Sequence, residues 1–380
     1  MRFEFATAAR IVFGPGTVRE VPAAAEKMGR RALLVTRASA DFKHSGIAGV
    51  PFPIHFPMHG EPTVDMVRQG TQLAREGGCD LVIALGGGSA IDAGKAIAAL
   101  LTNGGDPLDY LEVVGQAKSP SRPSAPFIAI PTTAGTGAEV TCNAVLASPE
   151  HRVKASLRSP RMLPKLAVVD PELTLDLPPA LTASTGIDAL TQLIEPYVSM
   201  RANTMTDLYC VEGMRLAASA LRRAWRHGHD LAARADMAFA SLLGGLALAN
   251  AGLGAVHGFA APLGGMFDAP HGALCAALLP HAMRVNIAAL RSAPPHMEGL
   301  LRYTVVARTL TGDAAAMPED GAAWVESLCR DLEIRPLGAY GVRAADVPAL
   351  ADKAARASSM KANPIVLTRG QLEELLTRAI

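Results

Sequence analysis

The first half of the chain alternates short apolar runs with longer segments whose apolar residues recur at helical spacing. Continuous apolar runs at residues 32–36, 80–85 and 127–130 are typical of parallel strands that are covered on both faces. Helices are predicted to begin near Thr17, Thr63 and Ser89. Shorter strands are predicted at residues 3–6, 10–13, 52–56 and 166–169, and a β-hairpin at residues 143–157. Strands that alternate with helices predict an α/β domain around a mostly parallel sheet.

The second half has a different pattern. From about Pro178 onward every long periodic segment has helical spacing, and runs of β-branched residues disappear. We therefore predict an α/β domain over residues 1–175 and an all-helical domain over residues 176–380. A charge-free stretch from Met237 to Val256 is about as long as a membrane span, but its many Ala, Gly and Leu residues favour a helix buried in the helical domain.

Composition agrees with a two-domain globular protein. The chain has 380 residues, 49% of them apolar, and a formal net charge of +1, which gives no support for a nucleic-acid or membrane-surface partner. The N-terminus lacks the apolar segment of a signal peptide. The five cysteines are scattered and show no CxxC spacing, which predicts reduced thiols in a cytoplasmic protein; they are Cys79, Cys142, Cys210, Cys275 and Cys329.

A glycine-rich turn joins one predicted strand to the next helix. Gly86, Gly87, Gly88 and Ser89 follow the run at 80–85 directly. Glycines let a ligand approach the backbone closely, and a helix N-terminus offers free N–H groups and a positive dipole, as a diphosphate requires. The turn lacks the GxGxxG fingerprint, so a simple tight turn remains an alternative. Asp92 and Lys95 lie on the first helical turns that follow, and a solvated helix surface is the alternative for both.

A second loop follows the predicted strand at 127–130. It contains Thr132, Thr133 and Thr136 among small residues. Open α/β sheets bind ligands at the carboxyl ends of their parallel strands, and two loops at one edge favour a nucleotide site.

A set of candidate metal ligands lies in the helical half. Asp188 and Gln192 are four residues apart within an apolar helix predicted over residues 179–199, so they project from one face. A buried carboxylate needs a partner or a cation. His257 and His271 flank a segment broken by glycines and a proline, which predicts one helix ending near 267, another beginning near 270, and both imidazoles at the junction. These four side chains suit a divalent metal, although local capping by Asp188 is the alternative.

Several longer motifs resemble the iron-containing (group III) alcohol dehydrogenases. They are GGGSAID at 86–92, PTTAGTGAE at 131–139, GIDAL at 186–190, and PLGG at 262–265 leading to PHG at 270–272. Their order and spacing agree over almost the whole chain. The resemblance implies a nucleotide-binding α/β domain, a helical domain, and reversible hydride transfer between NAD(P)H and an aldehyde, ketone or alcohol. It also implies a bound Fe²⁺ or Zn²⁺ that acts as a Lewis acid, and a homodimer, which is the habit of the family.

The match at the implied metal site is incomplete. The family's ligands are an aspartate, a histidine four residues on, and two histidines fourteen apart. Asp188, His257 and His271 fit three of these positions, whereas Gln192 replaces the second and Ala261 replaces a further histidine near the nicotinamide. An amide is a weaker donor than an imidazole to these metals. Gln192 is therefore expected to be a weak fourth ligand, or the enzyme works without metal, as the related maleylacetate reductases do.

The choice of cofactor is predicted from the end of the second strand. An acidic residue there would bind a ribose 2′-hydroxyl, but Arg37 and Ser39 stand there instead and suit a 2′-phosphate. We therefore expect NADP(H) to be preferred. Lys154, in the predicted hairpin, resembles a family lysine near the cofactor, and a surface role is the alternative.

Other activities share the architecture. A glycerol or polyol dehydrogenase is one, and a lyase of the dehydroquinate synthase type is another, although a lyase would require more basic residues. Outside the enzymes, the changes at Gln192 and Ala261 allow a nucleotide-binding protein that has lost catalysis. The retained Asp188, His257 and His271 favour the alcohol dehydrogenase or aldehyde reductase.

Overall fold

The computed structural model describes residues 2–37, 46–47, 49–50, 53–292 and 297–380. The chain forms two units. We call the first the sheet unit, which contains Phe5–Thr133 and Gly137–Asp176. The second is the helical unit, which contains Leu177–Ile380 together with the short segments Met1–Glu4 and Ala134–Thr136.

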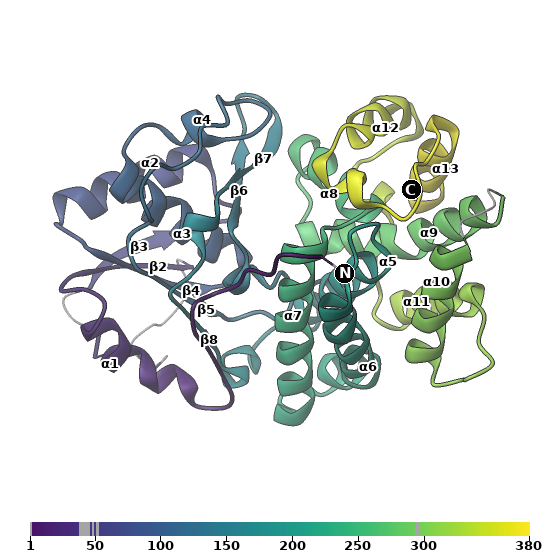
Figure 1. Ribbon diagram of the computed structural model, residues 1–380, viewed down its shortest axis with the longest axis horizontal. Coiled ribbons are helices and arrows are strands. Elements are labelled where there is room, and N and C mark those ends of the chain that lie inside the picture. The colour runs from purple at the N-terminus through teal and green to yellow at the C-terminus, as the bar shows by residue number, and fades with distance from the viewer. Residues whose placement is uncertain (1, 38–45, 48, 51–52, 293–296) are drawn as a thin grey trace. The chain divides into compact units, whose positions relative to one another are not determined.

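The sheet unit is built on six parallel strands in the order β1-β8-β5-β4-β2-β3 (Figure 1). Their bounds are β1 Ile11–Phe13, β2 Ala32–Arg37, β3 Ile54–Met58, β4 Leu81–Gly86, β5 Phe127–Pro131 and β8 Leu166–Val169. A separate antiparallel hairpin consists of β6 (Asn143–Ser148) and β7 (Val153–Arg158). The parallel sheet and the hairpin are as predicted.

Helices cover both faces of this sheet. Alternate residues of β2 point to opposite sides: Leu33 and Val35 pack with α2 (Val64–Glu76) and α3 (Gly88–Asn103), whereas Leu34 packs with α1 (Val21–Glu26). The short α4 (Pro107–Tyr110) follows α3. The continuous apolar runs of the sequence therefore reflect burial on two sides, as predicted.

Local signals determine several element ends. Thr63 caps α2, and its hydroxyl accepts a hydrogen bond from the backbone N–H of Met66, as its sequence position predicted. The predicted strand at residues 3–6 was wrong, because these residues form no strand, and the Phe3 side chain that would anchor it is 46% exposed. The strand predicted at 52–56 begins later, at Ile54; its first residue, 52, lies outside the described residues.

The helical unit has no strand among its described residues. Its α-helices are α5 Pro179–Val198, α6 Thr204–Arg226, α7 Leu231–Ala251, α8 Ala255–Met266, α9 His271–Ser292, α10 Met297–Thr311, α11 Pro318–Asp331, α12 Val347–Ala355 and α13 Arg369–Ala379 (Figure 1). The break predicted between residues 267 and 270 separates α8 from α9.

Two of these helices, α7 and α9, are long and apolar enough to cross a membrane by length and composition alone. Their most apolar windows are 67% and 83% buried, respectively, against other parts of the protein. Such burial is typical of core helices, and it matches the expectation for the charge-free stretch that overlaps α7.

Candidate nucleotide and metal sites

The glycine-rich turn joins β4 to the N-terminus of α3. Gly87 is the N-cap and α3 starts at Gly88, so the first N–H groups of this 16-residue helix lie at the carboxyl end of β4. A Cβ atom at Gly86 would lie 2.7 Å from the Cβ of Ala90, which makes glycine necessary there. The turn therefore combines a strand end, small residues and a helix N-terminus, which is the arrangement that a diphosphate requires.

The loop after β5 lies beside this turn. The backbone N–H of Thr132 donates to the Gly86 carbonyl at 3.0 Å, and the Thr133 side chain lies 3.3 Å from the position of a Cβ at Gly87. The structure thus brings the predicted residues Gly86, Gly87, Thr132 and Thr133 together. Thr136 belongs to the short segment that groups with the helical unit.

Asp92 takes part in a buried network behind the turn. Its carboxylate lies 3.1 Å from the Lys95 ammonium and accepts a hydrogen bond from the backbone N–H of Val145. Lys95 is almost fully buried and also donates to the Ala138 and Asn143 carbonyls and to the Thr141 hydroxyl. The expectation of a solvated helix surface, which was the alternative for Asp92, is wrong for both residues, because these bonds tie α3 to the segment at 138–145.

The other predicted cofactor residues are more dispersed. Arg37 ends β2 and is exposed, with its backbone nitrogen 4.0 Å from the position of a Cβ at Gly86. Ser39 lies outside the described residues. The Lys154 side chain is nearly buried on β7, with its ammonium 3.5 Å from a carboxylate oxygen of Glu61.

Three helices supply the candidate metal ligands. Asp188 and Gln192 are buried one turn apart on α5, His257 lies in the first turn of α8, and His271 is the first residue of α9. A Cβ at Gly272 would lie 2.7 Å from the Ser184 carbonyl oxygen, so glycine lets the start of α9 pack directly on the backbone of α5.

The predicted ligands converge within the helical unit. The Nε2 atoms of His257 and His271 lie 3.5 and 3.9 Å from Oδ1 of Asp188, and the two imidazole rings are 5.4 Å apart between centroids. Asp188, His257 and His271 therefore form one cluster. Cys275 completes it, because one ligand atom from each of the four residues lies within 4.8 Å of the others.

The sequence reasoning missed two residues of this region. Cys275 lies one turn after His271 on α9, and Glu195 lies two turns after Asp188 on α5. His257 Nδ1 donates to Glu195 Oε2 at 2.7 Å, and the backbone N–H of Val256 donates to Oε1. A proton on Nδ1 leaves Nε2 of His257 free to bind a cation. Helical spacing from the recognised residues was the signal that would have identified both.

The chemistry of the cluster fits a divalent cation. Oδ1 of Asp188 and Oε1 of Gln192 are buried and have no hydrogen-bond partner among the described residues. Burial alone would raise the pKa of Asp188, but the charge of His271 and the interaction with His257 outweigh it and lower the pKa to about 2. Burial would lower the pKa of His271, but Cys275 and Asp188 raise it to about 9. A carboxylate with an open oxygen among nitrogen and sulfur donors is suited to Zn²⁺ or Fe²⁺.

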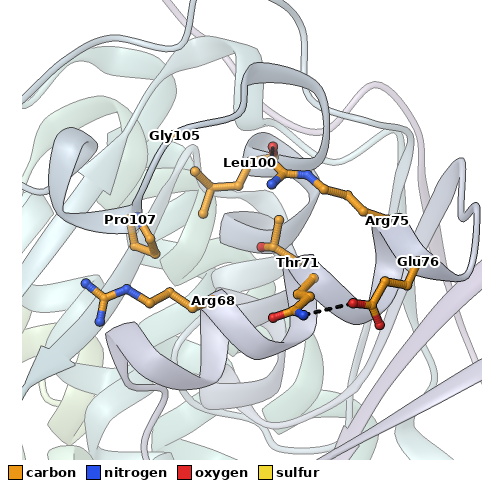
Figure 2. Close-up of a pocket in the computed structure, with 8 residues that line it drawn as sticks. Arg68, Thr71, Arg75, Glu76, Leu100, Gly105 and Pro107 are labelled. Atoms are coloured by element: carbon orange, nitrogen blue, oxygen red, sulfur yellow. Dashed lines mark hydrogen bonds between the residues drawn. The ribbon is translucent and has the colours of Figure 1, made fainter.

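One hollow of the described surface lies apart from these residues. It is a hollow of about 430 Å³ between α2 and the end of α3, lined among others by Arg68, Thr71 and Arg75 (Figure 2). Both guanidinium groups already have partners: Arg68 pairs with Asp65 and Asp106, and Arg75 donates to the Leu100 carbonyl. This pocket contains none of the predicted site residues.

Comparison with known proteins identifies the family. A family model for iron-containing alcohol dehydrogenase matches residues 8–171, and a model for the C-terminal part of the same family matches residues 182–380. The chain belongs to the iron-containing alcohol dehydrogenase family. Members use NAD(P) and a divalent metal, typically iron. The chain is accordingly an oxidoreductase of the alcohol dehydrogenase and aldehyde reductase type, with an alcohol or carbonyl compound as substrate.

Individual relatives align over most of their length. The 1,3-propanediol dehydrogenase of Klebsiella pneumoniae is 37% identical over 93% of this chain and 92% of its own. The lactaldehyde reductase of Escherichia coli K12 is 36% identical over 86% of this chain and 84% of its own. A crystal structure of a 1,3-propanediol oxidoreductase superposes with a TM-score of 0.92 at 32% identity and covers the whole of both chains. This agreement confirms the predicted family and fold class.

Proposed function

We propose that this chain catalyses reversible hydride transfer between NADP(H) and a short-chain aldehyde or alcohol, with residues 1–175 serving the cofactor and residues 176–380 the metal and substrate. The observation that carries the proposal is the convergence of Asp188, His257 and His271, together with the two buried oxygens that have no partner among the described residues. The small hydroxylated compounds in the names of the relatives above support aldehydes and hydroxyaldehydes of similar size as substrates.

Each unit has a separate task in this proposal. The N–H groups at the start of α3 bind the diphosphate, Thr132, Thr133 and Thr136 bind the diphosphate and ribose, and Asp92 lies towards the nicotinamide. The buried Lys95 network keeps the glycine turn in place. Lys154 is a further candidate for the cofactor side.

In the helical unit, Asp188, His257 and His271 hold the metal, with Gln192 as a weak fourth donor. A divalent ion at this position supplies Lewis-acid polarisation of the substrate oxygen. Glu195 holds the proton on Nδ1 of His257, so that Nε2 faces the cluster. Burial of Asp188 and His257 keeps water away from these donors and strengthens their electrostatic interactions.

The function is tested with protein purified without chelator, loaded with Fe²⁺ or Zn²⁺, and assayed with NADPH on a panel of short aldehydes. We expect turnover that a chelator abolishes and added metal restores. Gln192→His should raise metal occupancy, because imidazole is the better donor. Activity that survives complete metal removal would favour the metal-independent, maleylacetate reductase-like alternative. Cofactor binding without turnover would indicate a protein that has lost catalysis.

The preference for NADP(H) is supported by the exposed Arg37 at the end of β2, where no acidic residue stands. We expect a higher kcat/KM with NADPH than with NADH, and Arg37→Glu should reverse the order because a carboxylate repels the 2′-phosphate. Arg30→Glu, an exposed change before β2, is the control. A tenfold advantage for NADH in the unaltered enzyme would contradict the proposal.

We further propose that the protein is a cytoplasmic homodimer. The family habit supports the dimer, as do large apolar side chains exposed on neighbouring helices, such as Leu208 on α6 and Leu301 on α10. Free cysteines support a reducing compartment. Light scattering after gel filtration measures the mass, and a monomeric mass at micromolar concentration would contradict the dimer.

A further inference from the structure

Cys275 is the member of the cluster to which the family resemblance assigns no role. It is fully buried on α9, and its sulfur lies 3.6 Å from Nε2 of His271 and 3.8 Å from Nε2 of His257. Both nitrogens therefore face the sulfur. A thiol donates to one imidazole at most, and its sulfur is only a weak acceptor for the other, so hydrogen bonding accounts less well for the second approach than for the first.

The distances agree with shared coordination. With Zn–S near 2.3 Å and Zn–N near 2.05 Å, a tetrahedral ion separates sulfur from nitrogen by about 3.6 Å and nitrogen from oxygen by about 3.4 Å. The observed sulfur–nitrogen distances are 3.6 and 3.8 Å. The distances from Oδ1 of Asp188 to the two nitrogens are 3.5 and 3.9 Å.

Two buried oxygens independently indicate a ligand at this point. Asp188 is 1% exposed, and its Oδ1 lacks a hydrogen-bond partner among the described residues. One of its carboxylate oxygens lies within 4.8 Å of the cysteine sulfur. Oε1 of Gln192, one turn further along α5, is also buried and has no hydrogen-bond partner among the described residues. Leaving such groups without a partner is unfavourable, more so for a carboxylate, and a cation at the cluster removes that cost for Asp188.

We propose that the Cys275 thiolate is a metal ligand that takes the place which Gln192 fills only weakly. The ligand set becomes Asp188, His257, His271 and Cys275. The proposal rests on the metal site of the proposed function and refines it. Since thiolate is a softer donor than an amide oxygen or an imidazole, this set shifts the preference of the site from Fe²⁺ towards Zn²⁺. Metal binding releases the thiol proton to solvent.

Cobalt substitution tests the proposal without reference to activity. Co²⁺ added to the metal-free protein should give a thiolate-to-cobalt charge-transfer band in the near ultraviolet, together with visible ligand-field bands. Cys275→Ser and Cys275→Ala should lose the charge-transfer band, and competition with a chromophoric chelator should show Zn²⁺ affinity reduced by at least about tenfold, since even changes behind the ligands cost that much.

Cys329→Ser is the matched control. Cys329 is a half-buried thiol whose sulfur donates to the Ala276 carbonyl on α9 and makes no hydrogen bond to an imidazole among the described residues. This variant should keep the charge-transfer band and bind Zn²⁺ within about twofold of the unaltered protein, below the effect expected for a ligand.

The possible results distinguish the role of Cys275 from the existence of the metal site. Ligand-field bands without a charge-transfer band in the unaltered protein would overturn the role of Cys275 and leave the metal site intact. Failure of the unaltered protein to retain Co²⁺ or Zn²⁺ would overturn both proposals about metal. The spectrum of the unaltered protein decides between these results even if one Cys275 variant does not fold.

Discussion

Asp92 on α3 and Asp188 on α5 are both acidic residues on apolar helices, but their carboxylates have different surroundings. Asp92 is held by the Lys95 ammonium and the Val145 N–H. Asp188 faces two imidazoles at 3.5 and 3.9 Å, and its Oδ1 has no hydrogen-bond partner among the described residues. Burial raises the pKa of Asp92, whereas the charge of His271 helps lower that of Asp188 to about 2.

The difference shows how one residue type serves two purposes. In the sheet unit, the buried charges of Asp92 and Lys95 pair with each other and hold backbone segments in place, so these two side chains are not available to a ligand. In the helical unit, the side chains themselves are the ligands, and their bonding is incomplete without one. Substitution at each aspartate should therefore affect different properties.

The largest effect is expected from Asp188→Asn. Removing the carboxylate removes the one anionic oxygen of the predicted ligands, so metal content should fall below one tenth and kcat/KM by at least about a thousandfold, or about 4 kcal/mol. Thermal stability of the metal-free protein at neutral pH should fall, because His271 and His257 lower the pKa of Asp188 and so stabilise its ionised carboxylate in the folded chain. Asp230→Asn, at the N-cap of α7, is the control and should keep the metal. Full metal occupancy in the Asp188→Asn variant would contradict this role.

Much of the helical site could be predicted from the sequence, because the necessary signals are local. The spacing of Asp188 and Gln192 follows from helix geometry. The glycines and proline between the histidines predicted two helices, and the structure places His257 at the start of α8 and His271 at the start of α9. The family resemblance then assigned the chemistry.

The roles of the remaining residues could not be predicted, because they depend on contacts between parts of the chain that are distant in sequence. Cys275 looks like a core residue of an apolar helix until α8 and α5 bring His257 and Asp188 to it. Lys95 looks like helix surface, yet two of its bonding partners, Ala138 and Thr141, lie 43 and 46 residues later, in a segment before the hairpin that no periodicity predicts. The glycine turn was predictable because its backbone requirement is evident from adjacent residues.

The next effect in size concerns stability. Asp92→Asn leaves the buried Lys95 ammonium without its anionic partner, which should cost the sheet unit about 3–5 kcal/mol. Because two units need not unfold together, hydrogen exchange of the β4 amides is the suitable measurement. The metal content per folded chain should not change, in contrast to Asp188→Asn. An unaltered exchange rate in β4 would show that the Lys95 network does not depend on Asp92.

The smallest effect is expected at a third buried carboxyl group, that of Glu139, which extends the comparison of Asp92 with Asp188. Burial raises its pKa from 4.5 to about 7, and the nearby Lys95 only partly opposes this. Between these values the folded chain keeps a proton that the unfolded chain has lost, so the free energy of unfolding falls as pH rises from 4.5 to 7, by no more than about 3 kcal/mol. Glu139→Gln removes this titration. Relative to the unaltered protein, the variant should therefore gain stability between about pH 5 and pH 8.

Exchange of the β4 amides at several pH values measures that difference, with the exposed Glu150→Gln as control. A difference that stays constant with pH would mean that Lys95 keeps Glu139 ionised in the folded state throughout this range. In that case Glu139 would belong with Asp92, as a carboxylate held by an internal partner. If the difference rises as expected, the sheet unit accommodates one acidic group by pairing and another by protonation, and among these three only Asp188 retains an unpaired anionic oxygen for a cation.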